Sequence, residues 1–161
     1  MKIGIISDTH DNVVPLSKAI NYFLNSDIEA LVHAGDFVAP FVFREIKRLP
    51  VPLYAVFGNC DGEINGLSTM SNNHIKKAPY RFRLADKNIV VVHDIATLRI
   101  DEEIQNNNAD IIIHGHTHTP EITTHGKVLI INPGECCGIV NGIASCATLD
   151  LNTIKALIHT L

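Results

Sequence analysis

The first 57 residues alternate short aliphatic runs with segments of helical length, and this alternation restricts the fold more than any other feature of the chain. The aliphatic runs are KIGIIS, ALVHAGD and VPLYAVFGN, and the segments between them are PLSKAINYFL and PFVFREIKRL. Leu16, Ile20 and Phe23 recur at helical spacing, and Pro15 suits the first turn of that helix. Neighbouring parallel strands need crossovers of this length. The sequence therefore predicts strand, helix, strand, helix and strand in a parallel sheet covered by helices.

The second half of the chain carries shorter patterns. RFRLA and IVVVHD flank the polar turn DKN, which is typical of a hairpin, and we expect a helix from about Arg99 to Gln105. DIIIHGH, EITTHGKVLIINPG and IASCATLDLNTIKALIHTL then predict strands joined by turns, one at His125-Gly126 and another at Asp150 to Asn152. We expect mostly antiparallel pairing in this half.

Composition limits the class of protein. A chain of 161 residues is long enough to bury one sizeable core, and we expect one domain spanning residues 1–161. Its net charge of −4 gives no general attraction to nucleic acid or to an anionic membrane. The N-terminal apolar run is too short for a signal peptide, and no run approaches the ~20 residues that cross a bilayer. These features predict a soluble, cytoplasmic protein whose cysteines, none in a CxxC spacing, are reduced thiols.

Potential metal ligands follow five of the aliphatic runs. Strand carboxyl ends in an open α/β sheet form a common crevice, so side chains at these positions are expected to converge. The residues that follow the runs are Asp8, His10, Asp36, Asn59, His93, His114, His116 and His118.

Each of these motifs has an ordinary explanation when it is considered alone. Asp-x-His occurs as a turn with a capping aspartate, and Gly-Asn-Cys-Asp-Gly is a common turn sequence. A strand-end histidine such as His93 is usually a hydrogen-bonded interior residue. A series of such motifs in order along the chain is difficult to explain in this way, and the pattern favours one shared metal site.

The order and spacing of the motifs resemble the calcineurin-like metallophosphoesterases. The matching pieces are SDTH, GD, GNCD, the histidine that ends IVVVH, and GHTH, and INPGECCG resembles the small prokaryotic phosphodiesterase branch of that family. The resemblance covers nearly the whole chain. It implies a four-layer α-β-β-α sandwich of two mixed sheets flanked by helices, and phosphodiesterase activity on a small phosphate diester.

The resemblance also implies a dinuclear metal centre in which one residue bridges both ions. The first ion would be held by Asp8, His10, Asp36 and His118. The second ion would be held by Asp36, Asn59, His93 and His116. Mixed oxygen and imidazole donors suit two divalent ions, with Mn²⁺ expected first and Ni, Co, Fe or Zn also suitable. Paired cations about 3.5–4 Å apart would neutralise the phosphate charge and ionise a bridging water to the attacking hydroxide, while the Asn59 amide helps to hold the oxyanion charge.

Two motifs depart from the family pattern. Cys60 stands where many members have a histidine thought to protonate the leaving group, and a thiol with a usual pKa of about 8.5 is a poor substitute. Asp61, which would orient that histidine, is present without its partner. Asp94 and Ile95 replace the Gly-His that usually follows the histidine at the position of His93. We therefore expect diesters with good leaving groups to react and alkyl monoesters to react slowly.

Other chemically active residues are expected to have structural roles. His114 is predicted to lie outside the ligand set, and His33 to be buried and hydrogen-bonded. INPGECCG is predicted to be a structural turn in which Glu135 closes or caps the cleft. A solvated basic strand face is expected from Lys76, Lys77, Arg81 and Arg83, and contact with the substrate phosphate is the less favoured alternative.

Other functions fit the sequence less well. A binding scaffold like the vacuolar-sorting retromer subunit of the same fold is the main alternative, although that subunit has lost ligand positions and this chain keeps a donor at all of them. An amide hydrolase with one metal lacks an HExxH helix and a GxSxG motif. A dinucleotide-binding protein lacks a glycine-rich loop after the first strand. A homodimer is compatible with the sequence, which contains no feature that argues for one.

Overall fold

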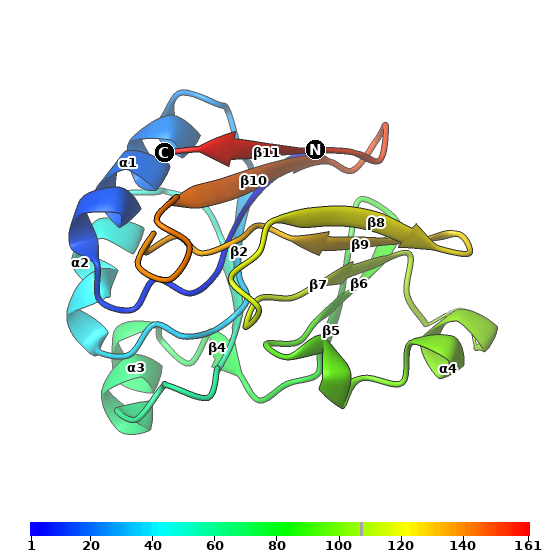
Figure 1. Cartoon of the computed structure of the whole chain (residues 1–161), viewed down its shortest axis with the longest axis horizontal. Helices are drawn as coiled ribbons and strands as arrows, with labels where there is room; N and C mark the ends of the chain where they lie inside the picture. The colour runs from blue at the N-terminus through cyan, green and yellow to red at the C-terminus, as the bar shows by residue number, and fades with distance from the viewer. Residues whose placement is uncertain (107) are drawn as a thin grey trace.

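The computed structural model describes residues 1–106 and 108–161. They form two β-sheets that pack face to face, with helices on the outer side of each (Figure 1). Within these residues no helix is both long and apolar enough to span a bilayer. In chain order the elements are β1 Lys2–Ile6, α1 Val13–Leu24, β2 Ala30–His33, η1 Pro40–Val42, α2 Phe43–Ile46, β3 Leu53–Val56, α3 Ile64–Met70, β4 Ile75–Lys76, β5 Tyr80–Leu84, β6 Lys87–Val91, η2 Ile95–Thr97, α4 Ile100–Gln105, β7 Ile111–Ile113, β8 Glu121–His125, β9 Val128–Asn132, β10 Ser145–Asp150 and β11 Lys155–Thr160.

The first sheet has six strands in the order β11-β10-β1-β2-β3-β4. β1 to β4 pair in parallel, with Ile3 opposite Ala30 and Leu31 opposite Leu53. β10 pairs antiparallel with both β1 and β11. The predicted series of parallel strands and helices is confirmed from β1 to β3. α3 and β4 lie outside the predicted elements, because INGLSTM and a two-residue strand give only weak periodic signals.

The second sheet has five strands in the order β5-β6-β7-β9-β8. The predicted hairpins are confirmed, because β5 pairs antiparallel with β6 and β8 with β9. The expectation of mostly antiparallel pairing is wrong at the centre of this sheet, where β6, β7 and β9 are parallel. The predicted helix, observed as α4, is the crossover between β6 and β7, and a strand-helix-strand unit of this kind makes its strands parallel.

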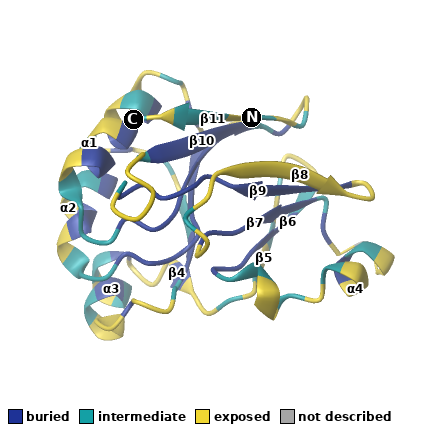
Figure 2. Cartoon of the chain, viewed as in Figure 1, coloured by how far each residue is buried: buried dark blue, intermediate teal, exposed yellow. Residues whose placement is uncertain are grey.

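Three apolar clusters correspond to the three interfaces between layers. One cluster packs α1, α2 and α3 on the outer face of the six-stranded sheet, and another packs η2 and α4 on the outer face of the five-stranded sheet. The third lies between the sheets, where Ile5 and Val32 of one sheet join Ile113 and Ile131 of the other. Figure 2 shows β7, β9 and β10 as buried and the edge strand β8 as exposed. This layering confirms the α-β-β-α sandwich.

Loops that follow strands of both sheets meet at one edge of the sandwich. The loop after β1 is bonded to the loop after β2, where the Asp8 N–H donates to the Gly35 carbonyl over 3.0 Å. The loop after β7 reaches across from the other sheet, and the His116 N–H donates to Asp8 Oδ2 over 3.1 Å. The side chains predicted from sequence as metal ligands lie on these loops.

Candidate metal centre

Asp36, the predicted bridging residue, lies between imidazoles from both sheets. Its Oδ2 atom is 3.5 Å from Nε2 of His10, which follows β1. The same oxygen is 3.4 Å from Nε2 of His93, which follows β6. The Asp36 carboxylate therefore has a nitrogen donor on each side.

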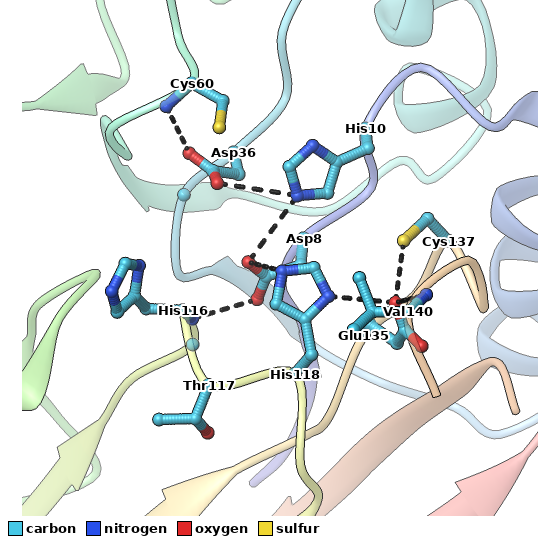
Figure 3. Close-up of polar contacts among 12 residues, drawn as sticks. Asp8, His10, Asp36, Cys60, His116, Thr117, His118, Glu135, Cys137 and Val140 are labelled. Carbon is cyan, nitrogen blue, oxygen red and sulfur yellow. Dashed lines mark hydrogen bonds and ion pairs between the residues drawn. The ribbon is translucent and has the colours of Figure 1, made fainter. Parts of the chain in front are cut away.

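Asp8 stands at one end of this arrangement. Its Oδ1 atom is 3.4 Å from His118 Nε2 and 3.9 Å from His10 Nε2 (Figure 3). The two rings are stacked with their centroids 5.2 Å apart. Ligand atoms of Asp8, His10 and His118 all lie within 4.8 Å of one another, which is close enough for one ion to contact all of them.

Asn59 stands at the other end. Its Oδ1 atom is 2.8 Å from His93 Nε2 and 2.9 Å from His116 Nδ1. The His93 Nδ1–H donates to the Ala34 carbonyl over 2.8 Å, so in the neutral ring Nε2 carries a lone pair. An amide oxygen and an imidazole lone pair that face each other are arranged as ligands of a cation between them.

The two carboxylates are buried without a Lys or Arg partner among the residues described. Asp8 is 0% and Asp36 2% exposed, and across residues 1–106 and 108–161 their ion-pair partners are histidines, with neither Lys nor Arg among them. Asp8 Oδ1 and His10 Nε2 are buried atoms with no hydrogen-bond partner in the part of the chain described. Buried charges need compensation, and divalent cations held by these donors would provide it. The residues thus fit a metal centre.

The ionisation of Asp36 and His93 is coupled. Burial alone would raise the pKa of Asp36, but hydrogen bonds from His93 and from the Cys60 N–H hold it well below its usual range. Burial would lower the pKa of His93, but the hydrogen bonds to Asp36 and the Ala34 carbonyl and the charges of Asp36 and Asp8 together outweigh this and raise it. Asp36 is therefore a carboxylate at neutral pH, which is the form that a metal ligand requires.

Many of the predicted ligands have left-handed backbone conformations. The φ angle is 53° at Asp8, 39° at His10, 61° at Asp36, 69° at His116 and 61° at His118. Non-glycine residues rarely adopt such angles, which cost of order 1–3 kcal/mol each. Strain of this kind persists where surrounding contacts impose it and is concentrated at functional sites.

Gly115 allows the loop after β7 to approach Asp8 closely. A Cβ atom at this position would lie 1.8 Å from Ser7 Oγ and 2.5 Å from Asp8 Oδ2. Both distances are far inside van der Waals contact, so a larger residue would displace Asp8. Glycine here is a requirement of the site and not only of the turn.

Cys60 and Asp61 lie beside the cluster in different environments. The exposed Cys60 donates its N–H to Asp36 Oδ1 over 2.8 Å, and desolvation together with the Asp36 carboxylate raises the pKa of its thiol to about 11. The buried Asp61 carboxylate accepts backbone N–H groups from Val38 over 2.7 Å, Gly58 over 2.8 Å and Asp36 over 3.2 Å. Asp61 therefore ties together the loops that follow β2 and β3.

The other histidines near the cluster have structural partners. His33 is fully buried and His114 is 4% exposed. His33 Nδ1 accepts the Gly35 N–H over 3.1 Å, so its buried and hydrogen-bonded state is confirmed. The ring of His114 contacts the Gly115 carbonyl over 3.2 Å, away from the ligand atoms described above.

The predicted basic face is divided by ion pairs. Arg81 pairs with Glu103, and Arg83 pairs with Asp86. Lys77, by contrast, lines a hollow of about 410 Å³ beside Asn59, His93 and His116. A separate hollow of about 260 Å³ is lined by His10, His118, Cys137, Ile139 and Val140. The two hollows share no lining residue, and each is bordered by one end of the cluster.

Glu135 is more closely connected to the cluster than its motif indicates. Its carboxylate is fully buried and accepts the His118 Nδ1–H over 2.8 Å (Figure 3). The sequence predicts only a residue that closes or caps the cleft, because INPGECCG carries no pattern that connects it with GHTH. Its acidic side chain between glycine and cysteine, in a predicted structural turn, is the only signal available.

Comparison with known proteins identifies relatives of the whole chain. A family model described as the calcineurin-like phosphoesterase superfamily domain matches residues 1–154. A protein of Methanocaldococcus jannaschii named phosphodiesterase MJ0936 is 36% identical over 154 residues, which cover 93% of each chain.

Solved structures give the same result for the fold. The structure of an archaeal phosphodiesterase superposes with a TM-score of 0.90 at 34% identity and covers all of both chains. The zinc complex of Vps29 from Entamoeba histolytica superposes with a TM-score of 0.74 at 19% identity, covering 100% of this chain and 93% of the other. At 19% identity, the similarity to Vps29 shows a shared fold and nothing about function.

Proposed function

Because this chain belongs to the calcineurin-like phosphoesterase superfamily, we propose that it is a dinuclear metal-dependent phosphodiesterase acting on a small phosphate diester. The coarser statement, that the protein is a phosphoric ester hydrolase, follows from the family and from relatives named as phosphodiesterases. The observation that carries the proposal is the buried pair Asp8 and Asp36, which faces imidazole nitrogens at 3.4–3.5 Å and has neither Lys nor Arg as a partner among the residues described.

We assign seven side chains to two ions that share Asp36. The first set is Asp8, His10, Asp36 and His118. The second set is Asp36, Asn59, His93 and His116. Two divalent cations held there would supply a hydroxide nucleophile near neutral pH and neutralise the charge of the phosphate. Mn²⁺ is the first ion to test, because mixed carboxylate, amide and imidazole donors suit it, and Ni, Co, Fe and Zn follow.

The remaining polar groups of the site support diester chemistry with good leaving groups. In this proposal the Asn59 amide lies next to the reacting phosphate and steadies its oxygens. The Cys60 thiol, with its pKa raised to about 11 by desolvation and by Asp36, is a weak proton donor at neutral pH. A leaving group that needs no protonation should therefore depart readily, whereas an alkoxide should depart slowly. Asp61 acts indirectly by fixing the loops that carry Asp36 and Asn59.

The two hollows support a diester in preference to a monoester. A diester has two organic groups on one phosphorus atom. A phosphate bound by cations that Asp36 holds would have one hollow towards His116 and another towards His118. Apolar residues border both, including Phe57 and Ala78 in the first and Ile139 and Val140 in the second. A monoester would fill only one of them.

The experiment is metal-dependent hydrolysis of bis(p-nitrophenyl) phosphate by chelator-stripped protein. Mn²⁺, Ni²⁺, Co²⁺, Zn²⁺ and Mg²⁺ are restored separately, and p-nitrophenyl phosphate is measured beside the diester. We expect turnover that requires metal, is lost in Asp36→Asn, and is faster for the diester. Asp27→Asn makes the same chemical change at an exposed position and should leave turnover unchanged. Faster hydrolysis of the monoester would overturn the assignment to diesters.

A catalytically weak scaffold that acts through protein contacts is the second candidate, and the shared fold of Vps29 is the observation that favours it. Binding of two ions per chain without turnover of either ester would support the scaffold. Metal-dependent turnover that needs Asp36 would remove it.

A further inference from the structure

Glu135 is a fully buried carboxylate whose ion-pair partner, in the part of the chain described, is the imidazole of His118 and neither Lys nor Arg. Burial would raise its pKa, but the hydrogen bonds from His118 and from backbone N–H groups lower the pKa of Glu135 to about 2. Its donors are the His118 Nδ1–H at 2.8 Å, the Cys137 S–H at 3.1 Å, and the N–H groups of Ile139 at 3.2 Å, Val140 at 2.9 Å and Asn141 at 2.5 Å. The carboxylate is therefore charged and fully engaged inside the protein.

This group is not itself a metal site, although His118, Glu135 and Cys137 lie within 4.8 Å of one another. An ion there would have to displace the backbone N–H groups that already occupy Glu135 Oε1 and Oε2. Burial and the neighbouring Glu135 also raise the pKa of the Cys137 thiol to about 12, and a protonated thiol is a poor ligand. The contacts of Glu135 are those of a hydrogen-bond acceptor.

The acceptor determines the tautomer of His118. A hydrogen on Nδ1 is required for the bond to Glu135, which leaves Nε2 with its lone pair in the neutral ring. Nε2 is the atom that lies 3.4 Å from Asp8 Oδ1. Histidine ligands commonly donate their second nitrogen to a carboxylate, which fixes the ring and makes it a stronger donor.

The same carboxylate holds the segment 139–141 beside His118. The side chains of Ile139 and Val140 are 63% and 67% exposed, so their own packing does not hold this segment in place. Their N–H groups are bonded to Glu135, and the Asn141 side chain donates to the His118 carbonyl over 2.8 Å. Glu135 thus connects His118, a predicted ligand, with Ile139 and Val140, which line the hollow next to it.

We propose that Glu135 is a positioning residue, which holds His118 with Nε2 directed at the Asp8 end of the metal centre and fixes Ile139 and Val140 beside it. The inference rests on the proposed function in taking His118 as a ligand of the first ion. Glu135 touches neither the ion nor the substrate, and it acts through the orientation of the ring and of the loop.

The first test uses unaltered protein without metal. Long-range ¹H–¹⁵N spectra of ¹⁵N-histidine-labelled protein are recorded at pH of about 8.5, above the range in which free imidazoles titrate. We expect the His118 ring in the Nδ1–H form, assigned by its absence in His118→Gln. An Nε2–H form, or averaging between the two forms, would overturn the proposal.

The second test compares Glu135→Gln with Glu63→Gln, which makes the same change at an exposed position. Mn²⁺ is titrated calorimetrically into each chelator-stripped protein. We expect Glu135→Gln to weaken one of the two sites roughly 10–100-fold, as found when outer partners of metal-bound histidines are removed, and to leave the other site unchanged. Glu63→Gln should behave as the unaltered protein.

Other outcomes are equally decisive. Unchanged affinity at both sites, or equal weakening of both in a folded variant, would overturn the proposal. If circular dichroism shows that Glu135→Gln does not fold, the histidine spectrum of the unaltered protein decides alone. Neither readout needs substrate, so a chain that holds His118 as proposed but hydrolyses no diester would contradict the proposed function and not this inference.

Discussion

The kind of partner at each ring nitrogen distinguishes the structural His33 from the histidines proposed as metal ligands. His93 donates Nδ1–H to the Ala34 carbonyl and His118 donates Nδ1–H to Glu135, so each keeps one nitrogen towards the carboxylates. His33 lies in the same region and has both nitrogens engaged, Nδ1 by the Gly35 N–H and Nε2 by Thr9 Oγ1. Because the ring of His33 accepts the Gly35 N–H, its lone pair is already used and is not available to an ion. The Thr9 hydroxyl in turn donates to the Asp36 carbonyl over 3.2 Å, so His33 is connected through Thr9 to the backbone of Asp36.

His33 should make the stability of the metal-free protein depend on pH. Burial, opposed only partly by the charge of Asp36, lowers the pKa of His33 from 6.5 to about 3. Between these values the unfolded chain binds a proton that the folded chain does not, so stability falls as pH falls below about 6.5. His33→Gln removes this contribution. We expect the unaltered protein to lose about 1.4 kcal/mol more than the variant between pH ~7.5 and ~5.5.

Urea unfolding in the presence of a chelator measures both proteins at both values of pH. Both proteins contain the same carboxylates, so the contribution of these groups cancels when the loss of unfolding free energy in the variant is subtracted from that in the unaltered protein. Equal losses of unfolding free energy would show that His33 takes up a proton in the folded state and would contradict the prediction.

At the scale of the element, loops and crossovers determine which side chains meet. The parallel connection from β6 through α4 to β7 brings the end of each strand to the same edge, where the His93 carbonyl accepts the Gly115 N–H over 3.0 Å. α4 is short, and its first turn carries acidic residues. The Arg81 side chain on β5 pairs with the buried Glu103 of α4 and ties the crossover to the sheet. The crossover therefore depends on a charge pair as well as on apolar packing.

Arg81→Ala should destabilise the protein by about 1–3 kcal/mol, because it leaves the Glu103 carboxylate buried without its donor. Arg83→Ala is the matched control on the same strand. Its partner Asp86 is exposed, so we expect a change below about 0.5 kcal/mol. Chemical denaturation of each variant gives the two values. A similar loss of unfolding free energy in both variants would contradict the importance of Glu103 burial. The double variant Arg81→Ala, Glu103→Met removes the buried charge as well and should recover part of the loss.

At the scale of the molecule, the candidate centre exists only where the two sheets meet. Asp8, Asp36 and Asn59 follow strands of the six-stranded sheet. His93, His116 and His118 follow strands of the five-stranded sheet. Ions held by this set would cross-link the edges of both sheets. Because the donors are far apart in an unfolded chain, binding would favour the folded state.

Metal should therefore raise the stability of the whole protein. Each site that is filled by Mn²⁺ at about 100 times its dissociation constant stabilises the folded protein by about 2.7 kcal/mol. For a chain of this length, each filled site should therefore raise Tm by roughly 5–10 °C. Asp36→Asn should lose most of this rise, because both ions share that carboxylate. Asp27→Asn should keep it. Calorimetric scans with metal and with chelator measure the rise in each protein, and an equal rise in Asp36→Asn would contradict the shared position of Asp36.

The sequence by itself determines the alternating strands and helices, the hairpins, and the positions of donors after the strands. These features depend on local periodicity and on the fact that parallel strands end at a common edge. The seven ligand positions proposed here are those predicted from the sequence, and their assignment to ions stays a prediction. His33 is also buried and hydrogen-bonded, as the sequence predicts.

Only the tertiary structure decides how distant segments complete the site. The parallel centre of the second sheet, the engagement of Asp61 with loops on either side, and the contact of Glu135 with His118 involve partners that no local pattern connects. A hydrogen bond between buried groups depends on their positions in space, and these are fixed by the packing of the two sheets as a whole. For that reason the donors of the candidate centre can be found in the sequence, whereas the contacts that orient them appear only in the fold.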